Sequence, residues 1–312
     1  MPSSFEIFQA IVSGILLGGV YAVLGVGFGL AWGVMDVINL SHAAFALLAT
    51  YIAYWANNAL HLDPLLSLLI SVPLFFLVGI VLYRVIIKVM AKKAQDLVAA
   101  SLVLTFGLAI ILENSMQYIW KPDPRTITLG YTGKSFFIAN VSIPYTSLIG
   151  FILALVTAAC IYLFLHRTFL GKAVRAVWQD KEGAALCGIN LDRVSAVTFG
   201  MSLAAAAAGG VCMSIIYSFN PSTHFIWLIY IFIVVIVGGV GSVAGTVVAG
   251  ILIGLIANLS AVFIPYAWVN MVLFGILVAI LLANVSLAVA TGIGMSRDDV
   301  GGAGGPSSAE RL

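Results

Sequence analysis

Charged residues are scarce in this sequence, and one long segment has none at all. From Val194 to Ser296 there is no Asp, Glu, Lys or Arg. Charged residues make up 8% of the chain and hydrophobic residues 62%, whereas a soluble globular domain has about 25% charged residues. The mean hydropathy of +1.14 agrees with this bias. The composition therefore excludes a soluble domain and predicts an integral membrane protein.

Residue patterns that would support covalent chemistry are also missing. The cysteines, Cys160, Cys187 and Cys212, have no metal-ligand spacing, and the sequence contains no recognisable catalytic triad. The segment Thr128–Ser135 ends in Gly-Lys-Ser, but Thr128 takes the place of the first glycine that a phosphate-binding loop needs. We therefore expect no catalytic residue, cofactor, metal or nucleotide site. The formal net charge of +2 does not indicate a nucleic-acid partner either.

Apolar windows long enough to cross a bilayer recur along the chain. A transmembrane helix needs about 20 mostly apolar residues. We predict spans at residues 8–32, 38–56, 64–86, 98–118, 145–166, 195–217, 226–240, 245–263 and 267–290. Hydropathy leaves open whether the short seventh span and the eighth cross twice or form a re-entrant pair. The sequence thus predicts an all-α polytopic membrane protein with eight or nine transmembrane helices.

Basic residues orient these helices, because they concentrate on the cytoplasmic side. Most of them follow the third span, lie between the fifth and sixth spans, or lie in the tail: Arg84, Lys88, Lys92, Lys93, Arg167, Lys172, Arg175, Lys181, Arg193, Arg297 and Arg311. Lys121, Arg125 and Lys134 are exceptions in an outward-facing loop. Nine crossings, which we prefer, place the N-terminus outside and the C-terminus in the cytoplasm. Residues 292–312, rich in Gly and Ser, are predicted to be a disordered cytoplasmic tail.

Glycines gather between the seventh and eighth predicted spans. Gly238, Gly239, Gly241 and Gly245 are predicted to form a non-helical hinge or a tight turn, because glycine tolerates positive φ angles and close backbone approach. Broken helices at membrane depth occur where protein or a water-filled cavity satisfies the freed backbone groups. This segment favours a transporter over an inert membrane anchor.

A few polar residues lie inside the predicted spans. Asn39, Ser41 and His42 lie where the first span meets the second, and Glu113 lies toward the outer end of the fourth. Ionisable residues at membrane depth are candidates for a substrate path. We predict that these four residues line or gate a translocation path. The alternatives are that His42 is a structural, hydrogen-bonded histidine and that Glu113 reaches the outer interface or pairs with a backbone group.

The segment 167–194 is a charged island in this apolar chain. Acidic residues open the stretch Asp180–Gly188 and a glycine closes it, which is typical of a short helix with a favourable dipole. A small apolar surface flanked by charges suits docking on a soluble protein. The predicted docking residues are Asp180, Lys181, Glu182, Ala184, Ala185, Leu186 and Gly188. The alternative is a solvated cytoplasmic loop.

Four segments together resemble the branched-chain amino acid permease branch of the membrane subunits of ATP-binding-cassette importers. They are the glycine-rich opening span Leu16–Leu30, Asn39-Leu-Ser-His42 followed by Phe45, the loop from Gly171 to Asn190, and Gly238-Gly-Val-Gly-Ser-Val-Ala-Gly-Thr246. Ala43 stands where the family's Asn-Phe-(Ala/Ser)-His-Gly segment has its glycine. The resemblance covers about Ile11 to Ala290 and implies a transmembrane permease domain over residues 1–291 with a docking loop at 167–194.

The resemblance implies a function as well as a fold. It implies a multi-pass protein of the bacterial inner membrane that forms the translocation path for branched-chain or other apolar amino acids. The implied partners are a second permease subunit, the same or a related chain, two cytoplasmic ATPases that hydrolyse ATP, an extracytoplasmic solute-binding protein and the lipid bilayer. Urea, amides and small carboxylates remain alternative substrates. A proton-coupled secondary transporter and a purely structural membrane subunit are the alternative function classes.

Overall fold

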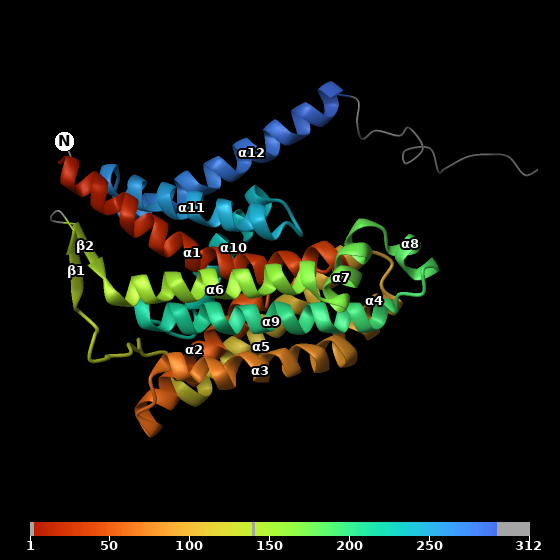
Figure 1. Ribbon diagram of the computed structural model, residues 1–312, viewed down its shortest axis with the longest axis horizontal. Coiled ribbons are helices and arrows are strands. Elements are labelled where there is room, and N and C mark those ends of the chain that lie inside the picture. Colours follow the sequence, from red (N-terminus) through yellow and green to blue (C-terminus); the bar gives the residue numbers. More distant parts are fainter. Residues whose placement is uncertain (1–2, 139–140, 292–312) are drawn as a thin grey trace, which may run out of the picture.

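The structure, a computed structural model, describes residues 3–138 and 141–291, and the predicted tail 292–312 lies outside them. Helices dominate this part of the chain (Figure 1). They are α1 (Ser4–Met35), α2 (His42–Leu60), α3 (Pro64–Leu82), α4 (Lys88–Lys93), α5 (Leu97–Trp120), α6 (Tyr145–Arg167), α7 (Phe169–Gln179), α8 (Lys181–Leu186), α9 (Leu191–Ile216), α10 (Thr223–Gly238), α11 (Val243–Phe263) and α12 (Val269–Thr291). A π-helical segment (Tyr83–Ile87) joins α3 to α4, and a 3-10 turn (Tyr266–Trp268) precedes α12.

The bundle has two different ends (Figure 1). One end, called here the α8 end, carries α4, α7 and α8. The other, called the hairpin end, carries the N-terminus and an antiparallel pair of strands, β1 (Ser135–Ile138) and β2 (Val141–Pro144), with Ser135 opposite Pro144. The hairpin was not predicted from the sequence, which indicated only a loop between two spans.

Six helices in the described ranges are long and apolar enough to cross a membrane, which supports the predicted all-α polytopic fold with a lower count of full spans. They are α1, the continuous segment from α3 to α4, α5, α6, α9 and α11. The other three predicted spans correspond to α2, α10 and α12, of which α10 and the first part of α12 are shorter apolar helices. The second predicted span also begins too early, because α2 starts only at His42.

The core of the bundle is built around α1 and α9, which are mostly buried along their length. α1 packs along α11, and α9 packs along α3. Glycine permits the first of these contacts: a Cβ added at Gly18 would lie 2.6 Å from the Gly250 carbonyl oxygen, and one at Gly254 would lie 2.3 Å from the Gly14 carbonyl oxygen. Small residues at such crossings allow membrane helices to approach closely and gain packing energy.

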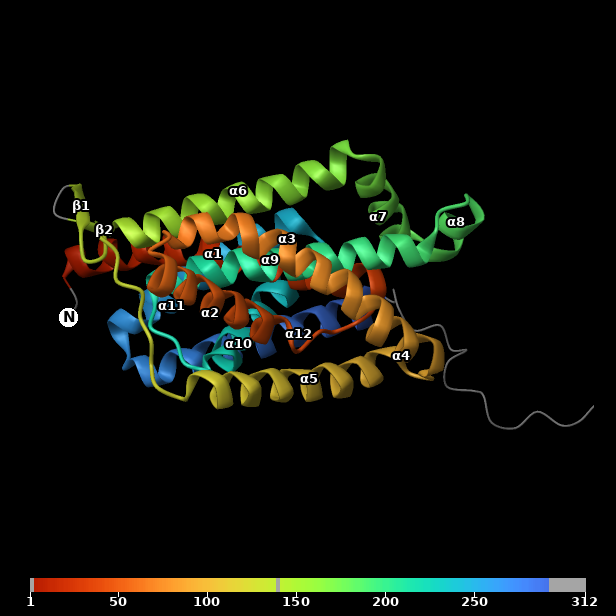
Figure 2. The ribbon, with the colours of Figure 1, turned by 90° about the horizontal axis from the view of Figure 1, so that it is seen from below.

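Figure 2 shows α6 along one side of the bundle and α5 along the opposite side, with α1, α2 and α9 between them. α5 and α6 both expose large apolar side chains, including Ile111 and Val103 on α5 and Leu163 on α6. Apolar residues on the outside and in the core are expected of helices surrounded by lipid, because the hydrocarbon offers no water to polar groups.

Candidate functional site

The first candidate site is the start of α2, where the chain is interrupted inside the bundle. Asn39, Ser41 and His42 are at most 1% exposed and lie together at this start. The Asn39 Oδ1 atom accepts hydrogen bonds from the Ser41 backbone N (3.1 Å) and from the Ser41 hydroxyl (2.5 Å). His42 contacts the Leu24 carbonyl oxygen through Nε2 (3.1 Å) and the Ser202 hydroxyl through Nδ1 (3.3 Å).

These contacts favour a structural role for His42 in the conformation described, since both ring nitrogens have protein partners. Asn39 differs: its Nδ2 atom is buried and has no hydrogen-bond partner among the described residues. An unpaired buried donor costs about 1–3 kcal/mol. The path role of these three residues stays a prediction, because none of them lines an open cavity here.

The non-helical segment before α2 is stabilised by hydroxyl groups of α5. The Ile38 backbone N donates to the Ser101 hydroxyl (3.1 Å) and the Leu40 backbone N donates to the Thr105 hydroxyl (3.0 Å). The Thr105 hydroxyl in turn donates to the Ile38 carbonyl oxygen (3.0 Å). Backbone groups freed by a broken helix in the hydrocarbon must be satisfied by protein, and α5 does so at this place.

A second helix start, at α10, has the same local structure. The Asn220 Oδ1 atom accepts from the Ser222 backbone N (3.1 Å), as Asn39 does from Ser41, and the Thr223 backbone N donates to the Asn220 carbonyl oxygen (3.0 Å). The motif Asn-x-Ser before a short apolar helix occurs at both places. Sequence reasoning missed the second one, although this repeated motif could have identified it.

Glu113 belongs to the α10 start and not to the α2 start. Its Oε1 atom accepts hydrogen bonds from the Ser222 hydroxyl (2.6 Å) and from Gln117 Nε2 (3.1 Å). α5 therefore contacts both interrupted segments, through Ser101 and Thr105 near its beginning and through Glu113 further along. The structure separates the four predicted path residues: Asn39, Ser41 and His42 lie at the α2 start, whereas Glu113 on α5 lies at the α10 start.

α2 and α10 lie next to one another in opposite directions. Phe219, which precedes Asn220 near the α10 start, packs against Tyr51 and Tyr54 in the second half of α2. Further along α10, Phe232 packs against Phe28, which also contacts His42 at the start of α2. Each helix thus begins beside the body of the other; the α2 start is buried, whereas Ser222 at the α10 start is exposed. Short helices that begin at membrane depth are a recurrent element of transporter binding sites.

The predicted helix break is present between α10 and α11. α10 ends at Gly238 and α11 begins at Val243, with Gly239 and Gly241 at φ of +84° and +83°. Gly238 and Gly245 lie at the ends of the two helices and touch, because a Cβ at Gly245 would lie 2.0 Å from the Gly238 carbonyl oxygen. The segment is a tight turn at the α8 end, and movement about it stays a prediction.

This turn contacts the segment that was predicted to dock. A Cβ at Gly241 would lie 2.5 Å from Nε1 of Trp178 on α7, and a Cβ at Gly33 on α1 would lie 2.7 Å from the Gly241 Cα. Gly241 is therefore held between α1 and α7. α7 is an amphipathic helix with Val174 and Val177 buried, and it was not predicted from the sequence as a separate helix.

The predicted docking helix corresponds to α8. Asp180 caps it, with Oδ1 accepting from the backbone N atoms of Glu182 and Gly183 (both 3.0 Å), and Gly188 follows its end at φ +82°. Lys181 forms an ion pair with Asp36 at the end of α1. The cap and the glycine fix both ends of this short helix.

One of the predicted docking residues faces inward. Ala184 is 5% exposed and packs in the cluster that contains Val174, Val177 and Val194, so it cannot form part of a free apolar surface. Ala185 and Glu182 are exposed, and Leu186 is 89% exposed. The apolar surface of α8 therefore consists of Ala185 and Leu186. Their role in docking stays a prediction.

Comparison with known proteins places this architecture in one family. Residues 10–282 match the family model described as the permease component of the branched-chain amino acid transport system. The chain is 26% identical to the permease protein BraD of Pseudomonas aeruginosa, over 90% of this chain and 95% of the relative. It is 26% identical to LivH of Escherichia coli K12 with the same coverage, and 24% identical to the probable LivH of Methanocaldococcus jannaschii over 88% of each chain.

These three relatives are described as permease proteins of branched-chain amino acid transport. No solved structure matches the chain significantly. The family match spans the broken α2, the α7–α8 segment and the α10–α11 turn. The chain belongs to the family of branched-chain amino acid transport system permease components.

Proposed function

We propose that this chain is one of two membrane subunits that form the translocation path of an ATP-driven importer for branched-chain amino acids. The second subunit is the same or a related permease chain. Two ATPases on the cytoplasmic side hydrolyse ATP, and an extracytoplasmic binding protein delivers the substrate. The chain itself carries out no covalent chemistry in this scheme. The family match and the relatives' names support the transport function.

The α8 end is proposed to face the cytoplasm. Lys88 and Lys92 on α4 and Lys172 and Arg175 on α7 lie at this end, and basic residues concentrate on the cytoplasmic side of membrane proteins. The hairpin end then faces the binding protein. With α1 running from the hairpin end to the α8 end, this orientation places the N-terminus outside, as the charge pattern predicted.

The observation that carries the proposal is the contact from the docking segment to the membrane helices. Leu186 protrudes from α8, α8 is linked to α1 by Lys181, and α7 touches the α10–α11 turn through Trp178. A partner that binds α8 and moves it would therefore displace α1 and α10 directly. Coupling between α8 and the translocation path needs an element that has two conformations and whose equilibrium is shifted from either place. We propose that the turn at residues 239–242 is this element.

The path itself is proposed to pass the two interrupted helix starts. The α2 and α10 starts both lie against α5, which contacts them through Thr105 and Glu113. Backbone N–H groups at a helix start favour an anionic group such as a substrate carboxylate, and the Glu113 carboxylate favours a cationic group such as a substrate amine. An amino acid carries both groups.

Transport by the reconstituted complex tests this proposal. The purified permease subunits, ATPases and binding protein are incorporated in liposomes, and ATP-dependent uptake of leucine is compared with uptake of urea and of a short carboxylate. We expect uptake of leucine only. Uptake of leucine that follows a proton gradient without ATP, or uptake of urea in place of leucine, would contradict the proposal.

The variant Leu186→Asp tests the docking residue in the same system. Burying a leucine side chain contributes about 1.5–3 kcal/mol, so its loss should weaken ATPase association at least tenfold. Phe137→Asp is the matched control, since Phe137 is also an exposed apolar residue (66%) but lies in the hairpin at the opposite end. The control should retain normal ATPase association. Equal association of both variants with the ATPase would exclude Leu186 from the docking surface.

A further inference from the structure

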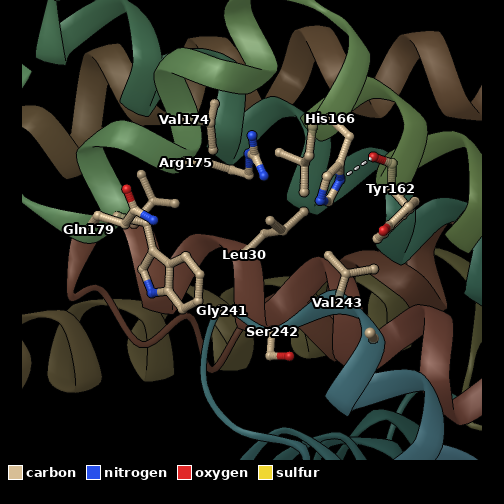
Figure 3. Close-up of a pocket in the computed structure, with 13 residues that line it drawn as sticks. Leu30, Tyr162, His166, Val174, Arg175, Gln179, Gly241, Ser242 and Val243 are labelled. Atoms are coloured by element: carbon tan, nitrogen blue, oxygen red, sulfur yellow. Dashed lines mark hydrogen bonds between the residues drawn. The ribbon is translucent and has the colours of Figure 1, made fainter.

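A cavity of about 320 Å³ lies at the α8 end between α1, α6, α7 and the start of α11 (Figure 3). Arg175, His166 and Gln179 supply polar groups to its wall, while Leu30 and Val243 supply apolar ones. The cavity lies against α6, on the side of the bundle opposite α5 (Figure 2). None of the residues that line it belongs to the two helix starts through which the substrate is proposed to pass.

Arg175 has an unused charge at this cavity. The two ion pairs among the described residues involve Lys88 and Lys181, so neither neutralises Arg175. Its Nε atom is buried and has no hydrogen-bond partner in the described part of the chain. A buried donor on a charged group without a partner is costly. The free guanidinium favours an anion with several acceptor oxygens, which it binds in a bidentate manner.

His166 adds a second polar group to the same wall. Its Nδ1 atom lies 2.9 Å from the Tyr162 carbonyl oxygen, and its ring stacks on the Tyr162 ring with centroids 4.0 Å apart. Since a carbonyl oxygen only accepts, Nδ1 donates this hydrogen bond. In this tautomer Nε2 carries the lone pair, so it can accept a hydrogen bond from a hydroxyl group of a ligand. Figure 3 shows both His166 and Arg175 at the cavity.

The remaining wall is apolar and aromatic. Leu165 and Val34 lie beside the cavity, and Trp178 and Tyr162 flank it. Aromatic side chains are common at the level of lipid headgroups, and basic pockets between transmembrane helices on the cytoplasmic side bind anionic headgroups. A cation beside an apolar wall matches an anionic headgroup that continues into an acyl chain.

We propose that this cavity binds an anionic phospholipid of the surrounding bilayer, with the phosphate at Arg175, a hydroxyl group of the headgroup at His166 and the beginning of an acyl chain along the apolar wall. The bound lipid links α6 and α7 to the start of α11. It thereby holds Trp178 against the glycine turn through which α7 contacts the membrane helices. The proposal concerns a lipid site and does not depend on the identity of the transported substrate.

Lipid binding to the purified, delipidated protein tests the proposal. Native mass spectrometry measures binding of phosphatidylglycerol, and of phosphatidylcholine with the same acyl chains as a neutral control. We expect preferential binding of phosphatidylglycerol to the wild-type protein and at least a tenfold loss for Arg175→Gln. Lys172→Gln is the matched control, since Lys172 is an exposed cation on the same helix that does not line the cavity. It should retain wild-type binding.

Two outcomes would overturn the proposal. One is an equal loss for Arg175→Gln and Lys172→Gln, which would indicate nonspecific attraction to basic residues. The other is equally tight binding of inorganic phosphate or glycerol phosphate, which would indicate a soluble anion instead of a lipid.

A measurement on the wild-type protein avoids any folding defect of the variants. A phosphatidylglycerol analogue with a photoreactive acyl chain is expected to label the peptides that contain Leu165 and Val174. Labelling confined to α5 or α12 would exclude this cavity as the site.

Discussion

The contact between Gly241 and Trp178 gives the most specific prediction of this structure. Gly239 and Gly241 both have a positive φ, at +84° and +83°. An alanine at either position costs about 1–3 kcal/mol for the positive φ. Only Gly241 has a close neighbour: a Cβ there would lie 2.5 Å from Trp178 Nε1, whereas nothing lies within 4 Å of a Cβ at Gly239. Gly241→Ala should therefore carry a further overpacking cost of about 1–3 kcal/mol.

The two alanine variants separate this contact from backbone strain. Thermal unfolding and substrate-stimulated ATPase activity of the reconstituted transporter are measured for Gly239→Ala and Gly241→Ala. We expect both to lose some stability, with the larger loss at Gly241, and only Gly241→Ala to lose most of its ATPase stimulation. Adding Trp178→Ala to Gly241→Ala should recover the additional stability that Gly241→Ala loses, because the clash is then removed. It should not recover the ATPase stimulation, because the contact between α7 and the turn is then absent. Equal stability and equal stimulation of the two single variants would refute the reasoning.

Three further predictions concern other parts of the chain. Ala185→Trp, at an exposed position of α8, should weaken ATPase association by about 1–3 kcal/mol while membrane insertion stays normal; full substrate-stimulated ATPase activity would contradict this. Asn39→Cys, in a background without the native cysteines, should be protected from water-soluble thiol reagents in this conformation, because Asn39 is 1% exposed. The introduced cysteine should react in another state of the ATP cycle, and protection in every state would exclude a path role. Burial, with the Asp63 carboxylate that accepts the hydroxyl hydrogen bond, raises the pKa of Tyr131 to about 12. The raised pKa stabilises the folded state below pH 10, and this contribution is lost as the pH rises through about 12. Between pH 10 and 12 the wild-type protein should therefore lose stability relative to Tyr131→Phe. Parallel curves of stability against pH for the two proteins would contradict this prediction.

Local sequence signals predicted the break between α10 and α11 and the ends of α8. The glycines at 238–245 predicted a break because two of them must adopt positive φ, which the structure shows at Gly239 and Gly241. Asp180 and Gly188 predicted the ends of α8 because a cap and a left-handed glycine are local features. Such signals depend on a few consecutive residues, so a single sequence is sufficient to recognise them.

Features that depend on tertiary packing were predicted less well. Ala184 was expected at the docking surface, but six residues of helix do not reveal which face packs on α7, and Ala184 is buried there. Glu113 was grouped with Asn39, although the sequence could not show that α5 contacts two separate helix starts. α2 begins at His42 and not earlier because Ser101 and Thr105 of α5 satisfy the extended segment before it, a long-range interaction that hydropathy does not detect.

Crosslinking from Cys187 tests the central claim most directly. Cys187 is native, exposed and adjacent to α8, so a photoreactive maleimide can be attached there in a protein with Cys160 and Cys212 replaced by serine. In membranes that contain the assembled transporter, we predict crosslinking to the ATPase subunit, with a yield that changes when ATP binds. The same label at Phe137→Cys in the hairpin should not reach the ATPase. Crosslinking of Cys187 to the extracytoplasmic binding protein, or ATPase crosslinking from the hairpin label, would contradict both the proposed orientation and the docking role of α8.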